Sequence, residues 1–305
     1  MAWMEILAPA KLNLFLELIN RRSDGFHELE TVMAPIDLYD RILMRRRTDD
    51  QITLTRAEAI TSSQSHLFEV PLDPTNLIWK ALNLLKAHSD KTLGVDVQVQ
   101  KCIPSQAGMG GGSSDAASTL LAANRMFALN LSRDTLIELA SQLGSDVAFF
   151  IDQQPARCTG RGEIIEPLRN FPPLNLVVTM PPCGLSTAAV FKNSSLPSTH
   201  QTSQPLIRGL TQRKLQQICR GMWNRLQSAA EAMSPWVSRL KNEFSNLPCM
   251  GHQMTGSGTA YFGVFQNAST ARRSEMLLKN RLPNCISFCV NTIAQPTHLM
   301  RYPQT

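Results

Sequence analysis

The sequence predicts a mixed α/β fold arranged in two domains, and three observations support this prediction. The chain has 305 residues, which is enough for two domains that each bury a core. Segments with the two-residue period of β-strands occur between segments with the 3.6-residue period of α-helices. Hydrophobic residues make up 43% of the chain and charged residues 18%, a composition typical of soluble globular proteins, and no apolar run is long enough to cross a membrane.

The first predicted elements are a strand near the N-terminus and a helix that begins close to residue 76. Residues 11–19, KLNLFLELI, set a lysine directly before an alternating apolar stretch, which favours a strand. Residues 75–88, TNLIWKALNLLKAH, carry apolar side chains at helical spacing. The inner face of this amphipathic helix consists of Ile78, Ala81, Leu82 and Leu85.

A strand, a glycine-rich loop and another helix follow in that order. Residues 95–100, VDVQVQ, alternate apolar and polar side chains, which indicates a half-buried strand that ends at Pro104. After the loop, residues 113–129 show helical spacing at Ala117, Leu120, Leu121 and Asn124. The polar residues at the start of this helix are two N-cap candidates, Ser113 and Ser114, and Asp115 in the first turn.

The next segments predict one more helix and a strand close to the C-terminus. Within residues 131–146, Ser132 is a suitable N-cap, apolar residues recur at helical spacing, and Gly144 ends the helix. Asp146 lies just past that end. Residues 259–265, TAYFGVF, predict a second apolar strand.

The boundary between the two domains is expected where the apolar pattern is interrupted by Pro172 and Pro173. We therefore divide the chain into residues 1–168 and 169–305. Residues 193–212 are rich in serine, threonine, glutamine and proline and contain few apolar side chains, so they predict a mobile surface excursion.

The cysteines and the N-terminal segment predict a cytoplasmic protein. The number of cysteines is odd and none forms a CxxC pair, which argues against a disulfide framework and against a zinc site. The N-terminal segment carries Glu5 and Glu17 and has no basic stretch ahead of its apolar residues, unlike a signal peptide. We expect reduced and mostly buried thiols at Cys102, Cys158, Cys183, Cys219, Cys249, Cys285 and Cys289.

The positive charge of the chain is concentrated in its second half. Residues 151–305 contain 16 Lys and Arg against 6 Asp and Glu, whereas residues 1–150 contain 14 against 18. Such asymmetry occurs in nucleic-acid-binding proteins and in proteins with anionic substrates. Because the basic residues are dispersed and no aromatic residues interleave with them, the sequence favours a solvated basic face over nucleic-acid binding.

The glycine-rich loop, PSQAGMGGGSSDAAS at residues 104–118, predicts a phosphate site. It is not a Walker A loop, because no lysine follows its glycines, and it is not a GxGxxG motif, because Ser113 stands where the third glycine belongs. Its unpaired amides run into a helix N-terminus, which attracts anions. The alternative is a tight turn that only permits close helix packing, but three consecutive glycines followed by two serines favour the phosphate site.

The sequence resembles a known family, the GHMP kinases, whose phosphate loop is similar to residues 108–114. The resemblance extends along nearly the whole chain. The other matching stretches are PAKLNLFLELINRRSDGFHELETVM, SQLGSDVAFFI, GRGEIIEPL and MTGSGTAYFGVF. The first of these is similar to the members of the family whose acceptor is a cytidylyl compound.

The resemblance implies a two-domain fold and an activity. The fold has an N-terminal ribosomal-protein-like βαβ domain and a C-terminal ferredoxin-like α/β domain, with the active site between them. The activity is transfer of phosphate from ATP, with Mg²⁺, to the 2-hydroxyl of a small cytidylyl substrate in the non-mevalonate isoprenoid precursor pathway. Alternatives are another GHMP kinase of the homoserine or mevalonate type, or a catalytically silent binding protein on the same fold. The sequence leaves monomer and homodimer open.

The family also implies site residues. Asp146 would accept the proton of the substrate hydroxyl, and Lys11 would lie beside it and orient that hydroxyl. The ATP-binding residues would be Pro104, Ala107, Gly108, Met109, Gly110, Gly111, Gly112, Ser113 and Ser114 at the phosphates, with Asn76, Leu77 and Lys101 near the adenine; Ser114 is also the candidate Mg²⁺ ligand. The substrate-binding residues would be Asn13, Phe26 and His27 at the cytidine, Phe191 as the facing wall, Thr187 at the phosphates, and Gly256, Ser257 and Gly258 over the diphosphate.

The site residues also have ordinary structural interpretations. An isolated aspartate such as Asp146 is usually a helix cap, an isolated lysine such as Lys11 is usually solvated, and phenylalanines usually pack in cores. The chain departs from the family pattern at Ser105-Gln106, Met109, Ala148 and Phe26. None of these departures removes a catalytic group; Gln106 bears on the nucleotide pocket, and Phe26 retains a stacking face without the hydroxyl of tyrosine.

Overall fold

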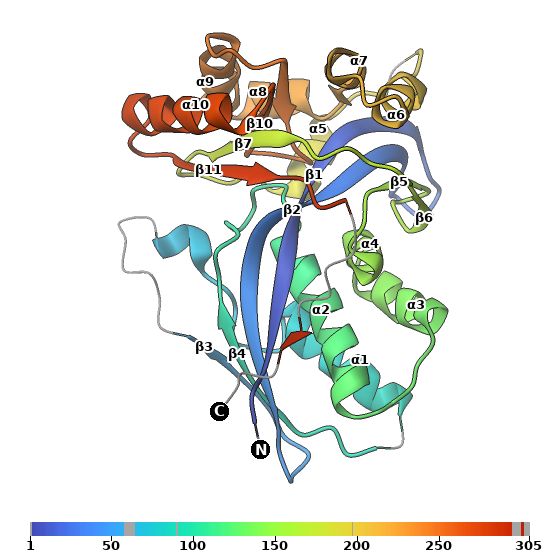
Figure 1. Cartoon of the computed structure of the whole chain (residues 1–305). Helices are drawn as coiled ribbons and strands as arrows, with labels where there is room; N and C mark the ends of the chain where they lie inside the picture. Colours follow the sequence, from blue (N-terminus) through green and yellow to red (C-terminus); the bar gives the residue numbers. More distant parts are fainter. Residues whose placement is uncertain (1, 58–64, 90, 197, 295–299, 302–305) are drawn as a thin grey trace.

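The computed structural model describes residues 2–57, 65–89, 91–196, 198–294 and 300–301 and contains two β-sheets with helices packed against them (Figure 1). Two long antiparallel strands, β1 (Met4–Arg21) and β2 (His27–Arg46), run through the lower part of the molecule and curve into the upper part. Register shifts at Pro9/Ala10, Asn13/Phe15 and Leu18/Asn20 interrupt their pairing. Irregularities of this kind bend a strand and increase its twist, which accounts for the curved path.

The larger sheet has the strand order β12-β1-β2-β4-β3, with β5 paired to β2 and β6, and β8 paired to β1. Its other strands are β3 (Ile52–Arg56), β4 (Val95–Gln100), β5 (Ala156–Thr159), β6 (Ile164–Pro167), β8 (Trp223–Asn224) and β12 (Met300–Arg301). Four helices cover one face of this sheet: α1 (Leu77–His88), α2 (Gly111–Met126), α3 (Arg133–Leu143) and α4 (Ser145–Asp152). A short 3₁₀ turn spans Ser65–Phe68.

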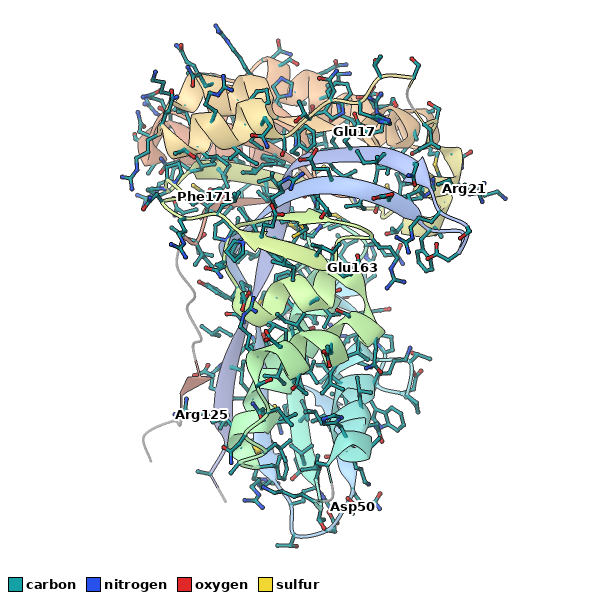
Figure 2. All side chains as sticks on the ribbon, turned by 90° about the vertical axis from the view of Figure 1, so that its right-hand side faces the viewer. Glu17, Arg21, Asp50, Arg125, Glu163 and Phe171 are labelled. Carbon is teal, nitrogen blue, oxygen red and sulfur yellow. The ribbon has the colours of Figure 1, made fainter. Side chains whose placement is uncertain are left out.

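The smaller sheet is antiparallel and has the strand order β11-β7-β10-β9. Its strands are β7 (Asn175–Met180), β9 (Gly251–Met254), β10 (Tyr261–Phe265) and β11 (Ile286–Asn291). The helices of the upper part are α5 (Thr187–Asn193), α6 (Gln204–Thr211), α7 (Leu215–Gly221), α8 (Gln227–Met233), α9 (Pro235–Ser245) and α10 (Ala268–Arg281). In Figure 2 these helices form a layer above the curved ends of β1 and β2, and Arg21 marks the tip of that hairpin.

Strand β1 contributes to each of the three hydrophobic clusters formed by the described residues. Its first buried residues, Met4 and Ile6, pack with α1, α2 and β4. Leu12 and Leu14 pack in the same cluster as strands of the smaller sheet, and Leu18 belongs to the cluster that includes α8 and α9. The two parts of the protein therefore share the strand that connects them.

Most of the predicted elements are confirmed: the strands at 11–19, 95–100 and 259–265 correspond to β1, β4 and β10, and the three predicted helices correspond to α1, α2 and α3. The start of α2 differs from the prediction. The N-cap is Gly110, in the left-handed conformation, and neither Ser113 nor Ser114 caps the helix. The helix begins earlier because glycine adopts positive φ without a steric penalty, so the turn closes before the serines.

The prediction of a mobile excursion at residues 193–212 is wrong. Part of this segment is helix α6, in which Leu206 and Leu210 are buried. Ser203, just before the helix, donates a 2.6 Å hydrogen bond to Glu30 of β2. The polar composition made the short apolar face of this helix hard to recognise in the sequence. Proline at the start of a helix favours the helix rather than breaking it.

The thiols also differ from expectation. All seven cysteines are free, but only Cys158 and Cys285 are buried, so the expectation of mostly buried thiols is wrong. The segment around Pro172 and Pro173 lies between β6 and β7, where the larger sheet gives way to the smaller one. The later strands β8 and β12 nevertheless return to β1, so the division at residue 168 stays a prediction. Among the described residues, no helix has the length and apolarity needed to cross a bilayer.

Candidate active site

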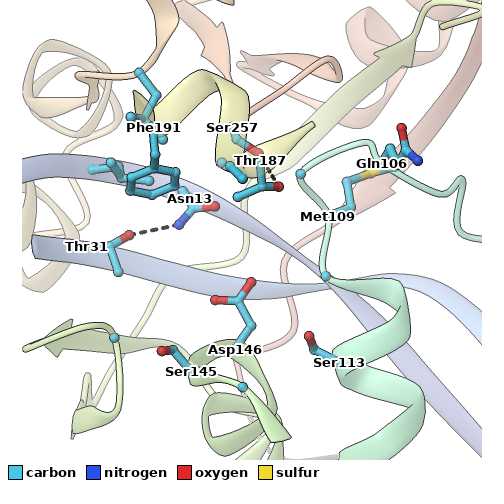
Figure 3. Close-up of a pocket in the computed structure, with 18 of the residues that line it drawn as sticks. Asn13, Thr31, Gln106, Met109, Ser113, Ser145, Asp146, Thr187, Phe191 and Ser257 are labelled. Carbon is cyan, nitrogen blue, oxygen red and sulfur yellow. Dashed lines mark hydrogen bonds between the residues drawn. The ribbon is translucent and has the colours of Figure 1, made fainter. Parts of the chain in front are cut away.

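A cavity of about 1240 Å³ lies where the two parts of the molecule meet. Residues of β1, the glycine-rich loop, the start of α4, helix α5 and the loop between β9 and β10 line it. Figure 3 shows Asp146 and Ser113 on the lower side, facing Asn13, Thr187 and Ser257 on the upper side. The volume exceeds the usual upper range of a pocket for one drug-sized ligand, about 1,000 Å³.

Lys11 and Asp146 form an ion pair in this cavity, with 3.4 Å between Nζ and Oδ2. Lys11 is 3% exposed, whereas the Asp146 side chain, in the first turn of α4, is 40% exposed. Lys11 Nζ also donates to Asn13 Oδ1 at 2.5 Å, and Asn13 Nδ2 donates to Thr31 Oγ1 at 2.9 Å. The amide thereby fixes the ammonium, and the carboxylate keeps an open side toward the cavity. Such an arrangement can accept a proton from a bound hydroxyl.

The glycine-rich loop is shaped by close packing against other backbone. Gly108 and Gly110 have φ of 74° and 71°, values that favour glycine. A Cβ at Gly108 would lie 2.3 Å from the carbonyl oxygen of Thr255, and one at Gly110 would lie 2.9 Å from the Phe150 ring. The amide of Lys11 donates to the Met109 carbonyl at 2.9 Å, which ties the loop to β1.

The start of helix α2 opens into the same cavity. Gly111, Gly112 and Ser113 all line it. A Cβ at Gly112 would meet only Leu77 Cδ1, at 3.8 Å, so the backbone here is open to a ligand. The first amides of a helix lack intrahelical partners and carry the positive end of its dipole. This terminus therefore suits a phosphate group.

Most of the predicted site residues come together in this cavity. Those that line it are Lys11, Asn13, Phe26, His27, Leu77, Lys101, Pro104, Ala107, Gly108, Met109, Gly110, Gly111, Gly112, Ser113, Asp146, Thr187, Phe191, Gly256 and Ser257. Asn76, Ser114 and Gly258 are not among the lining residues. Asn76 caps α1 through a 2.8 Å bond from the Ile78 amide, and Ser114 is fully buried, with a hydroxyl that has no hydrogen-bond partner among the described residues.

Aromatic side chains gather at the end of the cavity near the β1–β2 hairpin. The rings of His27 and Phe191 are 5.5 Å apart, and Phe26 is 56% exposed. Burial, and then the charge of Arg21, hold the pKa of His27 below its usual value, so the neutral imidazole is favoured. Nearby, Thr187 Oγ1 and Ser257 Oγ are hydrogen-bonded at 2.9 Å.

Three cations at this end were missed by the sequence reasoning. Arg21, Arg161 and Lys192 line the cavity, and the Arg161 guanidinium lies 5.1 Å from the centre of the Phe26 ring. Isolated basic residues give no periodic signal in a sequence. Arg161 lies in the GRGEIIEPL stretch that resembles the family, but the resemblance assigned it no role. Gln106, one of the departures from the family pattern, also lines the cavity and has a φ of 54°.

A buried charge cluster lies beside the end of the cavity that the glycine-rich loop lines, and it was also missed. Lys101, 7% exposed, pairs with Asp40 and with Asp115, and both carboxylates are buried. Burial raises the pKa of Asp115 to about 7, while Lys101 opposes this increase. The sequence suggested Asp115 only as a first-turn residue, and no local pattern singled out Asp40.

Comparison with known proteins gives two family matches in this chain. The model for the GHMP kinases N terminal domain matches residues 76–154, and the model for the GHMP kinases C terminal domain matches residues 206–274. The 4-diphosphocytidyl-2-C-methyl-D-erythritol kinase of Shouchella clausii is 37% identical over 269 residues, which is 88% of each chain.

Solved structures agree in fold. The crystal structure of a 4-(cytidine 5'-diphospho)-2C-methyl-D-erythritol kinase has a TM-score of 0.79 at 30% identity and covers 94% of this chain and 98% of its own. The homoserine kinase of Cytophaga hutchinsonii has a TM-score of 0.73 at 16% identity, with 97% and 96% covered, and shows similarity of fold alone.

Proposed function

The chain belongs to the GHMP kinase family, and from this premise we propose that it transfers the γ-phosphoryl group of ATP to the 2-hydroxyl of 4-diphosphocytidyl-2-C-methyl-D-erythritol. This reaction belongs to the non-mevalonate isoprenoid precursor pathway. The observation that carries the proposal is the Lys11–Asp146 pair, which faces the open N-terminus of α2 across one cavity. The choice of acceptor is supported by the names of relatives that match most of the chain.

In this proposal ATP lies with its phosphates against Gly111, Gly112 and Ser113. The backbone amides and the helix dipole stabilise the negative charge of the phosphates without water having to reorganise around them. Leu77, which lines the cavity next to Gly112, supplies an apolar contact toward the base. A side chain at Gly112 would project into open space beside the phosphates, whereas one at Gly111 would meet Ile103 and Asp40.

Asp146 acts as the base. The acceptor hydroxyl gives its proton to the Asp146 carboxylate while its oxygen forms a bond to the γ-phosphorus. The bond from that phosphorus to the β,γ-bridging oxygen breaks, and ADP leaves with the electron pair. Lys11, held by Asn13, keeps the carboxylate oriented and stabilises the charge that develops on the transferred group.

The aromatic end of the cavity would receive the cytidine. Phe191 and Phe26 offer ring faces for stacking, and neutral His27 has both a donor and an acceptor nitrogen for the pyrimidine edge. Arg21, Arg161 and Lys192 give this end a positive charge that suits a diphosphate.

The described residues of the site offer few ligands for Mg²⁺. The described residues contain no group of three or more His, Cys, Asp or Glu side chains that could hold a metal ion. The Ser113 hydroxyl lines the cavity, whereas Ser114 lies outside the lining. Ser113 would therefore hold the ion together with phosphate oxygens and water, as Mg²⁺ prefers. The ion would supply charge neutralisation on the phosphates. A cytoplasmic location and a monomeric or homodimeric state stay predictions.

The test is release of ADP when ATP is offered with each candidate acceptor. We expect ADP with the cytidylyl compound and none above background with homoserine or mevalonate. Asp146→Asn should lower kcat by about a hundredfold or more, because the proton acceptor is lost. Asp134→Asn, an exposed aspartate on α3, is the matched control and should leave kcat unchanged. No turnover with any acceptor, despite binding of ATP, would support the silent binding protein instead.

A further inference from the structure

Three charged residues from distant parts of the sequence meet beneath the glycine-rich loop. Asp40 belongs to β2, Lys101 follows β4 directly, and Asp115 belongs to α2. Asp40 is fully buried, and Asp115 is 2% exposed. Burying charged groups is costly unless they are paired and hydrogen-bonded, so a cluster at this depth calls for a physical reason.

The contacts of the cluster connect the two ends of the glycine-rich loop. Lys101 Nζ donates to Asp40 Oδ2 and, at 2.6 Å, to Asp115 Oδ2. Asp40 Oδ1 accepts from the amides of Cys102 and Ile103 at 2.6 and 2.8 Å. Asp40 therefore holds the segment that enters the loop, and Lys101 connects it to the helix that leaves the loop.

The cluster also lies directly under the first residue of α2. A Cβ at Gly111 would come within 3.3 Å of Asp40 Oδ2 and 3.0 Å of Ile103. Lys101 lines the cavity as well. An ammonium has three N–H donors, and the two carboxylates use two of them. The third N–H donor of the Lys101 ammonium remains available for a nucleotide bound in the cavity.

The polar atoms of the cluster are not all paired. Two carboxyl groups share one ammonium, and burial raises the pKa of Asp115, which favours its neutral form. Asp115 Oδ1 is buried with no hydrogen-bond partner among the described residues. The other ionisable groups of this region are Cys102 beside Asp40, and the Lys11–Asp146 pair on the far side of Gly110. A buried carboxyl oxygen without a partner is uncommon in native proteins and calls for an explanation.

We propose that Asp40 and Asp115 are positioning residues for ATP, which fix Lys101 and the first turn of α2 in the geometry that receives the nucleotide. This inference rests on the proposed function, because it assigns ATP to the α2 side of the cavity. Neither carboxylate touches the reacting atoms. Their effect reaches the nucleotide through Lys101 and through the backbone at Ile103 and Gly111.

The test compares KM values for ATP in variants of the full-length protein. Asp115→Ala removes an acceptor from Lys101 and should raise KM for ATP about tenfold, as expected for loss of a charged hydrogen bond, with KM for the acceptor unchanged. Asp115→Asn keeps one oxygen as an acceptor for Lys101, so it should restore most of the affinity. Asp40→Ala should be the most damaging, because Asp40 accepts three donors.

The matched control is Asp152→Ala. Asp152, 9% exposed, pairs with Arg133 on the helical side of the same part of the molecule and does not line the cavity. It should lower the melting temperature without raising KM for ATP. The proposal is wrong if Asp115→Ala leaves KM for ATP unchanged, as Asp152→Ala should. It is also wrong if Asp115→Asn has the same KM for ATP as Asp115→Ala. If Asp40→Ala fails to fold, the KM values of the two Asp115 variants still test the proposal.

Binding of a non-hydrolysable ATP analogue, measured by calorimetry, separates this inference from the proposed function. If wild-type protein binds the analogue but releases no ADP with the cytidylyl acceptor, the proposed function fails, and the dissociation constants of the variants still test the positioning role. If analogue affinity is the same in wild type, Asp115→Ala and Asp115→Asn, the positioning role fails whatever the acceptor is.

Discussion

At the scale of single residues, the chemistry of the site depends on a few side chains whose environment differs from that of their neighbours. Lys11 is buried in a strand, yet its ammonium contacts both Asn13 and Asp146. The family resemblance predicted this pair, and a buried lysine in an apolar strand needs such a counter-charge. The carboxylate is the more exposed partner, as a base must be.

His27 leads to a prediction about pH. Burial lowers its pKa below the ordinary 6.5, so the imidazole stays neutral at pH 7 and takes up a proton only at lower pH. If neutral His27 binds the pyrimidine edge, KM for the cytidylyl acceptor should be constant from pH 8 to about 6.5 and should rise below that range. His27 also favours folding in its neutral form, so its contribution to stability is lost as the pH falls.

Steady-state kinetics across this pH range provide the measurement. His27→Gln, which cannot titrate, is the control and should have a KM that is independent of pH over the same interval. An acceptor KM that improves in wild type as the pH falls through 6.5 would identify the imidazolium as the binding form and would contradict the prediction.

At the scale of elements, the loop from Pro104 to Gly112 decides how α2 presents its N-terminus. The sequence predicted the strand, loop and helix in the right order, because periodicity and glycine content are local signals. It missed the start of the helix at Gly111, since that start depends on the left-handed conformation of Gly110, which no periodic pattern reveals. Asp40 was also missed, because its partner Lys101 lies 61 positions away and no local pattern connects them.

Gly110→Ala should damage this loop. Alanine at a φ of 71° is strained by about 1 kcal/mol or more, and its Cβ would lie 2.9 Å from the Phe150 ring. We expect a lower melting temperature and a higher KM for ATP. Gly112→Ala is the comparison: its Cβ has only one neighbour within 4 Å, at 3.8 Å, and alanine favours a helix, so the variant should be at least as stable as wild type.

Thermal denaturation of the two variants decides between these expectations. Equal melting temperatures for Gly110→Ala and wild type would show that the turn has other conformations available, and the account of the helix start would need revision.

At the scale of the whole molecule, the two parts share the hairpin of β1 and β2. Family membership and the order of the motifs predicted a two-part molecule with a site in between, and the cavity lies there. The sharing of β1 by all three hydrophobic clusters was not predictable, since Leu12 and Leu14 look like ordinary strand residues. Helix α6 was missed for a related reason: Leu206 and Leu210 become informative only once their packing partners are known.

The shared hairpin predicts cooperative unfolding. Loss of either core removes packing from β1 in the other, so the two parts should unfold in one transition. In scanning calorimetry we expect a single peak whose calorimetric and van't Hoff enthalpies agree. The control is a repeat with a saturating ATP analogue, which should move the whole peak to higher temperature. Two separate peaks, with only one moved by the analogue, would contradict the prediction.

Strand β12 adds a consequence for synthesis in the cell. It pairs with β1 at Glu5 and Ile6, which lie almost 300 positions earlier in the sequence, in the lower part of the molecule in Figure 1. While the ribosome is still translating, the outer edge of β1 has no partner at these positions until residue 300 has emerged. The nascent polypeptide must keep that edge from pairing with other chains while the residues between β1 and β12 are translated.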